Sequence, residues 1–371
     1  MNVIRLRAQG LRNLHDLDFT PDGGVSIICG DNAQGKTNLL EAIWLFCGAR
    51  SFRGSKDGEY IAFDRDFVRL ELDFFAQGRG QSAVILIDRE KKQVQLNGIK
   101  QRGVSALSGI FRAVVFSPDH LELVKQGPRE RRRLIDISLC QAYPKYGKIL
   151  EGYEKILRQR GVLLKDAQTY PQVLDMLDAW DASLAEYGGY ITWMRARYVG
   201  KLAALAAEVY DGICAGREKF SASYAAGAGE TGYGADRKEI TEMLAKTVRE
   251  NLREDIRQGR TSAGPHRDDI EIMVDGKNAR AFGSQGQQRS CVLALKLAEC
   301  KILEESAGEP PVVLLDDVMS ELDSSRREYL LNHLCGRQVM ITCCDASAFG
   351  AMEGGKVFHM EKGVLAVGKL Q

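Results

Sequence analysis

The spacing of hydrophobic residues divides the chain into sheet-forming and helix-forming parts. Apolar and polar positions alternate over residues 3–8, 67–75 and 83–88, which predicts strands with one buried face. Residues 25–29 form a continuous apolar run, typical of a fully buried strand. Asn97-Gly98, between two further short strands, predicts a type I′ hairpin. The chain up to about residue 120 therefore combines a buried strand with a largely antiparallel sheet.

Helical spacing dominates the middle of the chain. Hydrophobic residues recur every three or four positions over residues 129–157 and 173–209, and Tyr170-Pro171 separates these runs. Residues 238–257 predict one more helix, and the Gly- and Ala-rich residues 225–235 predict a loop. The runs are too short and too interrupted for a long coiled coil.

Strands and helices alternate again in the last third of the chain. The expected order is a strand at 270–274, the hairpin turn Asp275-Gly276, a helix from about 282 to 305, a strand at 312–316, a helix to about 334, and strands at 338–342 and 356–367. Such alternation predicts an α/β architecture into which the helical segment is inserted.

Composition narrows the class of protein. With 371 residues, 44% of them hydrophobic, the chain is long enough for two lobes. A net charge of +1 means that any surface for nucleic acid must be local. The nine cysteines include no Cys-x-x-Cys pair and predict reduced thiols. No signal-peptide core and no apolar run of about 18 residues occurs, so we expect a cytoplasmic protein without a membrane partner.

A Gly-rich turn followed by lysine is the clearest chemical signal. The pattern G-x-x-x-x-G-K-T runs from Gly30 to Thr37, between the buried strand and helix-forming residues. Backbone N–H groups of such a turn and the positive end of the helix suit a triphosphate. Lys36 is expected to reach the β- and γ-phosphates, and the Thr37 hydroxyl to bind Mg²⁺. An ordinary strand–turn–helix connection is the alternative.

Two adjacent carboxylates end a later apolar strand. Asp316 is placed to hold Mg²⁺ through water, and Asp317 to orient or deprotonate an attacking water. A strand that ends in two aspartates is by itself more often a solvated strand end, so this assignment depends on the Gly-rich turn. Lys36 and Asp316 are 280 positions apart, which indicates a large insertion between the two halves of the site.

Residues 284–288, Ser-Gln-Gly-Gln-Gln, open a predicted helix. A hydroxyl, a glycine and amides at a helix N-terminus can form an anion site by the same physics as the Gly-rich turn. Taken alone, the stretch is better explained as a capped helix.

These three elements, in this order and with an inserted helical lobe, resemble the ABC-type ATPase head. Within that group the chain resembles the RecF family of bacterial recombination-mediator ATPases. The resemblance rests on LRAQGLRNL, SFRGSKDGEYI, FSPDHLELVKQGPRERRRLID, TSAGPHRDDIEI and LLDDVMSELDSSRR, which extend from one end of the chain to the other.

The resemblance implies a fold and its domains. The fold is an α/β ABC-type ATPase head, a P-loop core with an antiparallel β subdomain, plus an inserted, mainly helical lobe II without a long coiled coil. The expected boundaries are residues 1–118 and 262–371 for ATPase lobe I and residues 119–261 for lobe II.

The resemblance also implies an ATP site shared by two subunits, so that ATP with Mg²⁺ drives formation of a homodimer. It gives catalytic roles to Lys36 and Asp317 and places Mg²⁺ at Thr37 and Asp316. Ser284 and Gly286 would touch the γ-phosphate in the second subunit, and Asp323 would lie at the dimer seam. The other residues expected at the nucleotide are Gly30, Asp31, Asn32, Ala33, Gln34, Gly35 and Arg53.

The sequence departs from the family pattern at several positions. Ala33 replaces a small glycine, which should be tolerated if its φ is negative. Asp317 stands where the ABC pattern has glutamate, and this shorter carboxylate predicts slow hydrolysis. The lobe-joining glutamine is not evident at residues 117–119. The switch histidine is absent near residues 342–345, where Cys343 stands instead.

By the same resemblance we expect binding of double-stranded or gapped DNA and a role in recombinational repair, replication restart and the SOS response. The expected partners are RecR-like and RecO-like mediator proteins that help to load a recombinase, and the ATPase is expected to be weak and stimulated by DNA. Arginines at positions 129–133 are candidates for phosphate contacts, with a solvated helix start as the alternative. Further basic candidates are Arg53, Lys56, Arg102 and Arg112. Residues 264–269 are interpreted as lobe-packing or nucleotide-sensing.

Two other functions remain as alternatives. One is a transporter-type ATPase subunit that docks on a membrane protein, and the antiparallel N-terminal strands and the large insertion argue against it. The other is a structural head that binds ATP without hydrolysing it. Release of phosphate by the protein would exclude this alternative.

Overall fold

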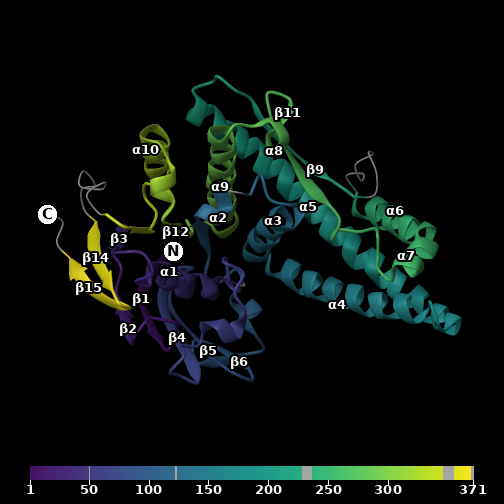
Figure 1. Ribbon diagram of the computed structural model, residues 1–371, viewed down its shortest axis with the longest axis horizontal. Helices are drawn as coiled ribbons and strands as arrows, with labels where there is room; N and C mark the ends of the chain where they lie inside the picture. Colours follow the sequence, from purple (N-terminus) through teal and green to yellow (C-terminus); the bar gives the residue numbers. More distant parts are fainter. Residues whose placement is uncertain (50, 122, 228–235, 346–354, 369–371) are drawn as a thin grey trace. The chain divides into compact units, whose positions relative to one another are not determined.

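The computed structural model describes residues 1–49, 51–121, 123–227, 236–345 and 355–368, which form two compact units (Figure 1). Unit 1 contains residues 1–122 and 292–371, and unit 2 contains residues 123–291. Residues 262–291 therefore belong to compact unit 2. The division into functional lobes stays a prediction.

A mostly parallel sheet forms the core of unit 1. Its six strands lie in the order β15-β14-β3-β13-β12-β8. Their bounds are β3 (Val25–Cys29), β8 (Ala113–Phe116), β12 (Val312–Asp316), β13 (Val339–Cys343), β14 (Lys356–Glu361) and β15 (Val364–Gly368). Every residue of β8, β12 and β13 is buried, which explains why these strands read as continuous apolar runs. The strands predicted at 25–29, 312–316, 338–342 and 356–367 are confirmed.

The second sheet of unit 1 is antiparallel and lies in the order β2-β1-β4-β5-β6-β7. Its strands are β1 (Asn2–Gln9), β2 (Leu17–Phe19), β4 (Phe67–Ala76), β5 (Arg79–Asp88), β6 (Lys92–Leu96) and β7 (Ile99–Gln101). In β4, alternate side chains from Val68 to Ala76 are buried. Asn97 and Gly98 both have positive φ, 50° and 77°, as a type I′ turn requires, so the predicted hairpin is confirmed.

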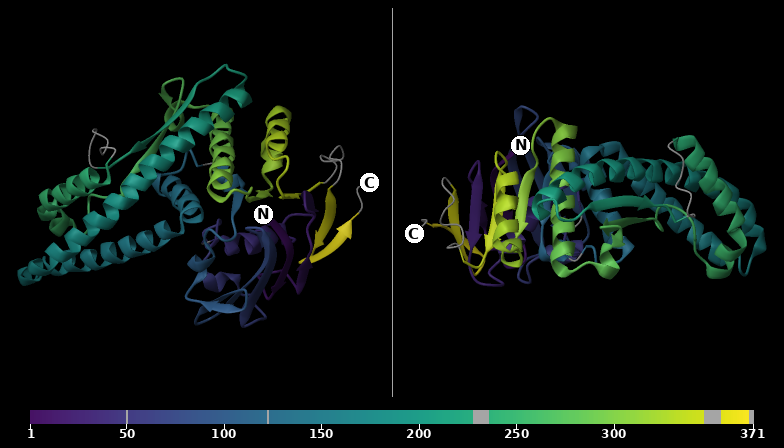
Figure 2. Two further views of the ribbon diagram at one scale, coloured as in Figure 1. Left: turned by 180° about the vertical axis from the view of Figure 1, so that it is seen from behind. Right: turned by 90° about the horizontal axis from the view of Figure 1, so that it is seen from above.

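Helices cover both faces of the core sheet. Helix α1 (Lys36–Trp44) lies between the two sheets, and seven of its nine residues are buried (Figure 1). Helices α9 (Gln285–Ala307) and α10 (Ser324–His333) rise on the opposite side of the core sheet, as the two views of Figure 2 also show. The short helices of unit 1 are η1 (Leu45–Cys47), η2 (Asp57–Tyr60), η3 (Val104–Leu107), α2 (Pro118–Leu121) and η5 (Val318–Glu321).

Unit 2 is built mainly from helices. They are α3 (Pro128–Ala142), α4 (Pro144–Asp166), η4 (Pro171–Met176), α5 (Leu177–Cys214), α6 (Arg237–Glu250), α7 (Leu252–Gln258) and α8 (Ala279–Phe282). A small antiparallel sheet in the order β11-β10-β9 packs along α5, with β9 at Phe220–Ala225, β10 at Asp269–Val274 and β11 at Lys277–Asn278. Among the described helices, none combines the length and the apolar content needed to cross a membrane.

The structure corrects two expectations in unit 2 and adds one strand. The helix expected over residues 129–157 is interrupted at Pro144, because a residue that precedes proline is forced out of the helical region; Tyr143 has φ −135° and ψ 88°. The helix expected over residues 238–257 is interrupted at Asn251. Strand β9 is not predicted, because its Ser- and Ala-rich sequence gives a weak apolar signal. Of the loop predicted at 225–235, residues 228–235 lie outside the described chain.

Two adjacent glycines allow α5 and α6 to approach closely. A Cβ atom on Gly189 would lie 2.2 Å from Oγ1 of Thr241, and one on Gly188 would lie 2.6 Å from Cδ2 of Leu244. Such distances are shorter than any van der Waals contact, so larger side chains would push the helices apart. The two glycines thus let Thr241 and Leu244 of α6 pack directly against α5.

Buried arginines join the helices of unit 2. Arg195 of α5 donates two hydrogen bonds of 2.8 Å to Asp136 of α3 and one to the carbonyl oxygen of Pro265. Arg160 of α4 is fully buried and pairs with Asp181 and Asp255. Removing one partner of such a buried pair costs about 3–5 kcal/mol, because the other charge is left unpaired.

His266 lies in the same interior and is held neutral. Its Nε2 lies 3.1 Å from the carbonyl oxygen of Thr261, which can only accept, so Nε2 carries the proton and Nδ1 accepts from the Tyr153 hydroxyl at 2.7 Å. Burial lowers the pKa of His266 to about 4. Residues 264–269 thus take part in the packing of unit 2.

We expect His266 to make stability depend on pH. As the pH falls from 6.5 towards 4, the unfolded chain binds a proton that the folded chain excludes, so the free energy of unfolding decreases, by at most about 3 kcal/mol. His266→Gln keeps a donor and an acceptor but does not titrate. Urea unfolding of both proteins at pH 7.5, 6 and 5 should show a steeper loss for the wild type. Equal losses would contradict the assignment.

Candidate functional site

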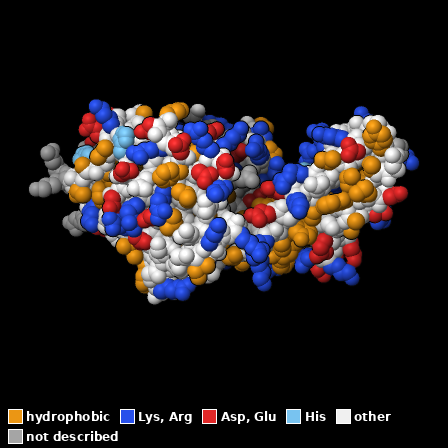
Figure 3. Space-filling model, turned by 90° about the horizontal axis from the view of Figure 1, so that it is seen from below, with side chains coloured by type: hydrophobic (Ala, Val, Ile, Leu, Met, Phe, Trp, Pro, Cys, Tyr) orange, Lys and Arg blue, Asp and Glu red, His pale blue; other side chains and the backbone are white. Residues whose placement is uncertain are grey.

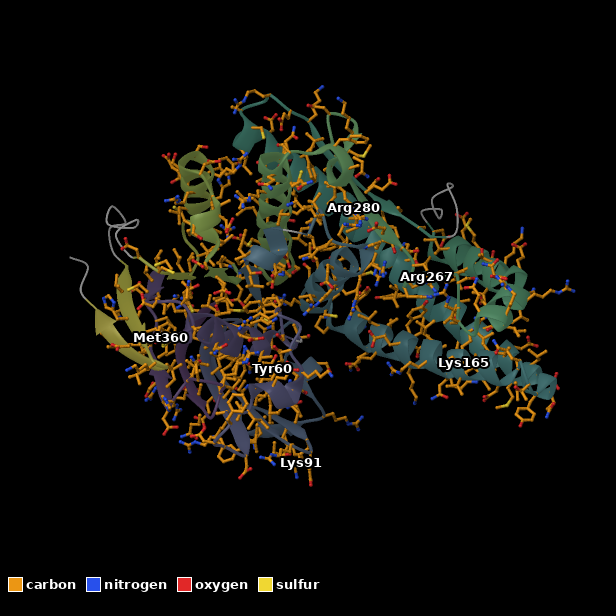
Figure 4. The ribbon with its side chains drawn as sticks, in the orientation of Figure 1. Tyr60, Lys91, Lys165, Arg267, Arg280 and Met360 are labelled. Atoms are coloured by element: carbon orange, nitrogen blue, oxygen red, sulfur yellow. The ribbon has the colours of Figure 1, made fainter. Side chains whose placement is uncertain are left out.

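The Gly-rich turn joins β3 to α1 and is shaped by two glycines. Gly30 has φ 152°, and a Cβ atom there would lie 2.3 Å from the carbonyl oxygen of Met360, which Figure 4 labels on β14. Gly35 has φ 114° and a Cβ atom there would lie 2.7 Å from Leu14. Both positions therefore require glycine, for conformation and for space.

Lys36 folds back over the turn. Its Nζ donates hydrogen bonds to the carbonyl oxygens of Gly30 and of Asp31, the latter at 2.8 Å, and its side chain is mostly buried. The ammonium group is therefore held at the centre of the turn by neutral acceptors. An anion in the turn offers a stronger, charge-assisted partner for the same donors.

Thr37 and Asp316 meet across 279 positions of sequence. The Thr37 hydroxyl donates to Oδ1 of Asp316 at 2.9 Å, and the Thr342 hydroxyl donates to the same oxygen at 2.9 Å. Burial raises the pKa of Asp316, while the two hydroxyl groups and the charge of Arg53 act in the opposite direction. A buried carboxylate with this environment favours a nearby cation.

These oxygen atoms fit Mg²⁺. A hydroxyl and a carboxylate oxygen within hydrogen-bonding distance of each other can both turn to one small, hard cation. In the described residues, no three His, Cys, Asp or Glu side chains gather into a metal site, so Mg²⁺ would need phosphate oxygens and water as its other ligands.

Asp317 follows Asp316 in a left-handed conformation, with φ 51° and ψ 21°. Its backbone N–H donates to the Thr342 hydroxyl at 3.0 Å. Thr342 thus accepts from one residue and donates to the other, which fixes the orientation of both at the end of β12. The only signal for Thr342 in the sequence is a polar residue near the end of an apolar strand.

Ala33 corrects an expectation about the turn. Alanine is expected to be tolerated at position 33 if its φ is negative, but the φ of Ala33 is +63°. A side chain in the left-handed region costs about 1–2 kcal/mol, so the turn carries strain that glycine would relieve. The exposed carbonyl of Ala33 accepts a hydrogen bond from Asn13 at 2.9 Å, which helps to hold this conformation.

A network of polar residues that sequence reasoning missed connects Arg53 to the turn. Arg12 pairs with the buried Glu41 at 2.8 Å and donates to Asn38 at 2.8 Å, one position after Thr37. Ser51 also hydrogen-bonds to Glu41, and Arg53 donates to Asn38 at 3.4 Å. The loop that carries Arg53 is therefore fastened to α1 next to Thr37. Tyr60, labelled in Figure 4, lies under the guanidinium of Arg12.

The C-terminal hairpin supports the same turn. The backbone N–H of Gly363 donates to the carbonyl oxygen of Gln34 at 3.0 Å, and the N–H of Lys362 donates to the Gln34 side chain at 2.6 Å. Sequence reasoning missed this contact, because nothing local relates positions 34 and 363.

Cysteines stand beside the turn where the family pattern has a switch histidine. Burial raises the pKa of Cys343 to about 12, so its thiol stays protonated and cannot serve as a base. Cys344 is exposed and donates to Asn32 Oδ1 at 3.2 Å.

The structure gathers the predicted residues into two groups. In unit 1 lie Gly30, Asp31, Asn32, Ala33, Gln34, Gly35, Lys36, Thr37, Arg53, Asp316, Asp317 and Asp323. Asp323 caps α10 by accepting from the N–H of Arg326, and this hydrogen bond, together with the Ser325 hydroxyl and the Arg326 side chain, lowers the pKa of Asp323 to about 2. Ser284 and Gly286 lie in unit 2, at the start of α9.

Ser284 forms a reciprocal cap with Gln287. The N–H of Gln287 donates to the Ser284 hydroxyl at 3.2 Å, and the N–H of Ser284 donates to the Gln287 side chain at 2.8 Å. The capped-helix interpretation of this stretch is therefore confirmed.

The arginines of residues 129–133 differ in their surroundings. Arg131 is buried, pairs with Asp269 at 2.8 Å and donates to three backbone carbonyl oxygens. Arg132 donates to the carbonyl oxygen of Asp268, and Arg133 pairs with Glu130. Arg131 thus serves the packing of unit 2, whereas Arg129 is exposed.

Comparison with known proteins identifies the family. The family model described as RecF/RecN/SMC N terminal domain matches residues 2–365. "DNA replication and repair protein RecF" of Agathobacter rectalis is 38% identical over 370 residues, covering 99% of each chain. The protein of the same name from Clostridium acetobutylicum is 37% identical over 345 residues, covering 92% of this chain and 93% of its own.

Solved structures agree. The recombination mediator protein RecF-ATPrS of the RecFOR pathway superposes with a TM-score of 0.92 at 35% identity, covering 99% of this chain and 98% of that chain. The Smc head domain derived from Pyrococcus furiosus, at 15% identity and a TM-score of 0.53, shares the fold alone. The resemblance drawn from the sequence is confirmed: the chain belongs to the RecF family of DNA replication and repair proteins.

Proposed function

We propose that this protein binds ATP with Mg²⁺ in unit 1 and uses the bound nucleotide to form a homodimer on DNA. The observation that carries the proposal is the convergence of Lys36, Thr37 and Asp316 at one end of the core sheet. The relatives whose structures are described as RecF-ATP and RecF-ATPrS support the choice of nucleotide.

Each residue of the site has a separate task in this proposal. The backbone N–H groups of residues 30–37 and the N-terminus of α1 hold the phosphates. Lys36 leaves the carbonyl oxygens that it now contacts and pairs with the β- and γ-phosphates. Thr37 and Asp316 hold Mg²⁺, which neutralises phosphate charge when bound. Arg53, fastened next to Thr37, adds positive charge at the nucleotide.

A second subunit completes the site. Ser284 and Gly286 lie at a helix N-terminus in unit 2, and a capped helix start of this kind still presents N–H groups and a positive dipole to an anion. In the dimer this helix start meets the γ-phosphate of the other subunit. ATP is then shared by two chains, and its hydrolysis separates them.

Hydrolysis is slow in this proposal. Asp317 orients the attacking water, but its carboxylate is shorter than the glutamate of the ABC pattern. Cys343 offers no base because its thiol stays protonated. A long-lived dimer suits a cytoplasmic protein that holds duplex or gapped DNA while RecR-like and RecO-like mediators load a recombinase during repair and replication restart.

We expect ATP with Mg²⁺ to double the mass of the protein from its monomer value of 41.1 kDa, as measured by light scattering. Lys36→Arg should weaken this dimerisation about 10-fold or more, because a guanidinium does not fit the space that the ammonium occupies. Lys362→Ala is the matched control, since only its backbone contacts the turn. A wild type that stays monomeric at saturating ATP while it binds duplex normally would refute the proposal.

Asp317→Asn should trap the dimer. An amide cannot take a proton from water, so the release of phosphate should fall by about 100-fold while ATP-driven dimerisation remains. The measurement is phosphate release with and without DNA. Normal hydrolysis by the variant would remove Asp317 from its assigned role, and no release by the wild type would favour a non-hydrolysing head.

DNA binding should depend on salt. Figure 3 shows basic side chains scattered among acidic and apolar ones, so phosphate contacts are expected from local groups. With about six contacts, the affinity for duplex in the presence of ATP should fall about 1,000-fold between 50 and 200 mM salt. A flat plot of log K against log salt would reject phosphate-dominated binding.

A further inference from the structure

The start of helix α9 is tied to the end of helix α5 through one glutamate. The side chain of Gln287 is held at both ends: its oxygen accepts from the N–H of Ser284 at 2.8 Å, and its Nε2 donates to Oε1 of Glu218 at 2.9 Å. Oε2 of Glu218 accepts from the Tyr210 hydroxyl at 2.7 Å and from the Cys214 thiol at 3.7 Å. A continuous set of hydrogen bonds within unit 2, here called the Glu218 network, thus joins Tyr210, Glu218, Gln287 and Ser284.

The packing around Glu218 fixes its place. Tyr210 is fully buried on α5, and its ring stacks on Phe220 of β9 with the two centroids 5.5 Å apart. The N–H of Lys219 donates to Oδ1 of Asp275 at 2.8 Å, and the N–H of Asp275 donates back to the carbonyl oxygen of Lys219 at 2.9 Å. The backbone that follows Glu218 is therefore pinned to the β10–β11 turn. A carboxylate held in this way is a fixed point for the groups that bind it.

Capping of α9 alone does not need Glu218. In a capping box the fourth side chain only has to accept from the N–H of the first residue, and a glutamine whose amide nitrogen faces water can do so. Here the amide nitrogen of Gln287 is engaged as well, so the side chain cannot rotate freely. The network therefore restrains the helix start more tightly than a cap requires.

The group that this restraint orients is the hydroxyl of Ser284. The Ser284 oxygen accepts from the N–H of Gln287 at 3.2 Å, which fixes the side on which its own proton points. Among the described residues, no group accepts a hydrogen bond from this hydroxyl, and Ser284 is exposed. Its proton is therefore available to an anion outside unit 2.

The neutral amide of Gln287 separates the charge of Glu218 from the helix start. A carboxylate directly at the N-terminus of α9 would repel a phosphate that approaches there. Because Gln287 stands between them in the network, Glu218 can orient Ser284 without contacting the anion itself.

We propose that Glu218 is a positioning residue of the shared nucleotide site: through Gln287 it orients Ser284, so that the Ser284 hydroxyl donates to the γ-phosphate held by the other subunit. The inference rests on the proposed function, in which two subunits share ATP. Glu218 neither touches the nucleotide nor transfers a proton. Its contribution is direction, because a hydrogen bond to phosphate weakens steeply when donor and acceptor are misaligned.

Glu218→Ala should separate nucleotide binding from dimerisation. The Gly-rich turn lies in unit 1, so the affinity of the monomer for a fluorescent ATP analogue should not change, whereas ATP-driven dimerisation in light scattering should weaken about 10-fold. Glu218→Gln keeps an oxygen atom for Gln287 and should restore most of the dimerisation. Glu208→Ala, which removes an exposed glutamate of α5, is the matched control. Normal dimerisation of Glu218→Ala would overturn the inference.

A swapped pair distinguishes orientation from a loss of folding. Gln287→Glu still accepts from the N–H of Ser284, because a capping box tolerates either residue, but it cannot donate to Glu218 and dimerisation should fall. In the double variant with Glu218→Gln, the new amide accepts from Tyr210 and donates to position 287, so dimerisation should return. A double variant that unfolds in urea like the wild type and yet fails to dimerise would contradict the role of the network.

Mixed dimers separate the inference from the function on which it rests. Lys36→Arg damages the Gly-rich turn of its own chain and Glu218→Ala the helix start of its own chain, so a dimer with one chain of each kind keeps one site with both halves unaltered. The mixture should release phosphate faster than either variant alone, and a mixture of Lys36→Arg with Ser284→Ala is the reference. Recovery with Ser284→Ala but not with Glu218→Ala would overturn the role of Glu218 alone. Recovery with neither would overturn the shared site, and the proposed function with it.

Discussion

The contact between Thr37 and Asp316 is the constraint on which the candidate site depends. It joins residues 279 positions apart, and it exists only because β12 lies in the core sheet at a register that ends both strands at the same edge. Parallel strands bring their carboxyl ends together, so the Gly-rich turn after β3 and the carboxylates after β12 meet without a specific pairing of their own. Unit 2 can therefore occupy the sequence between them while the sheet keeps its order.

Local chemistry predicted much of this architecture. The Asn97-Gly98 turn, the buried strands and the Gly-rich turn each depend on neighbouring residues, and each is found where the sequence places it. Conformations imposed by tertiary contacts were not predicted. The positive φ of Ala33 is one example, and the pairing of Arg12 with Glu41 is another, because neither has a short-range signal. Strand β9 was missed because its alternation is carried by Ser and Ala.

The two units are held together internally by different means. The central strands β8, β12 and β13 of unit 1 are buried along their whole length, whereas α3, α4 and α5 of unit 2 are joined by buried arginines that each satisfy several acceptors. Such pairs add little net stability over apolar packing, but they tolerate few alternative arrangements of the helices.

The backbone contact of Gly363 with Gln34 has a consequence for synthesis of the protein. The ribosome makes the Gly-rich turn more than 300 residues before the hairpin that braces it. Until residues 356–368 have been made, the turn lacks this support. The turn thus acquires its final support only after unit 2 and the later strands β12 and β13 have been synthesised.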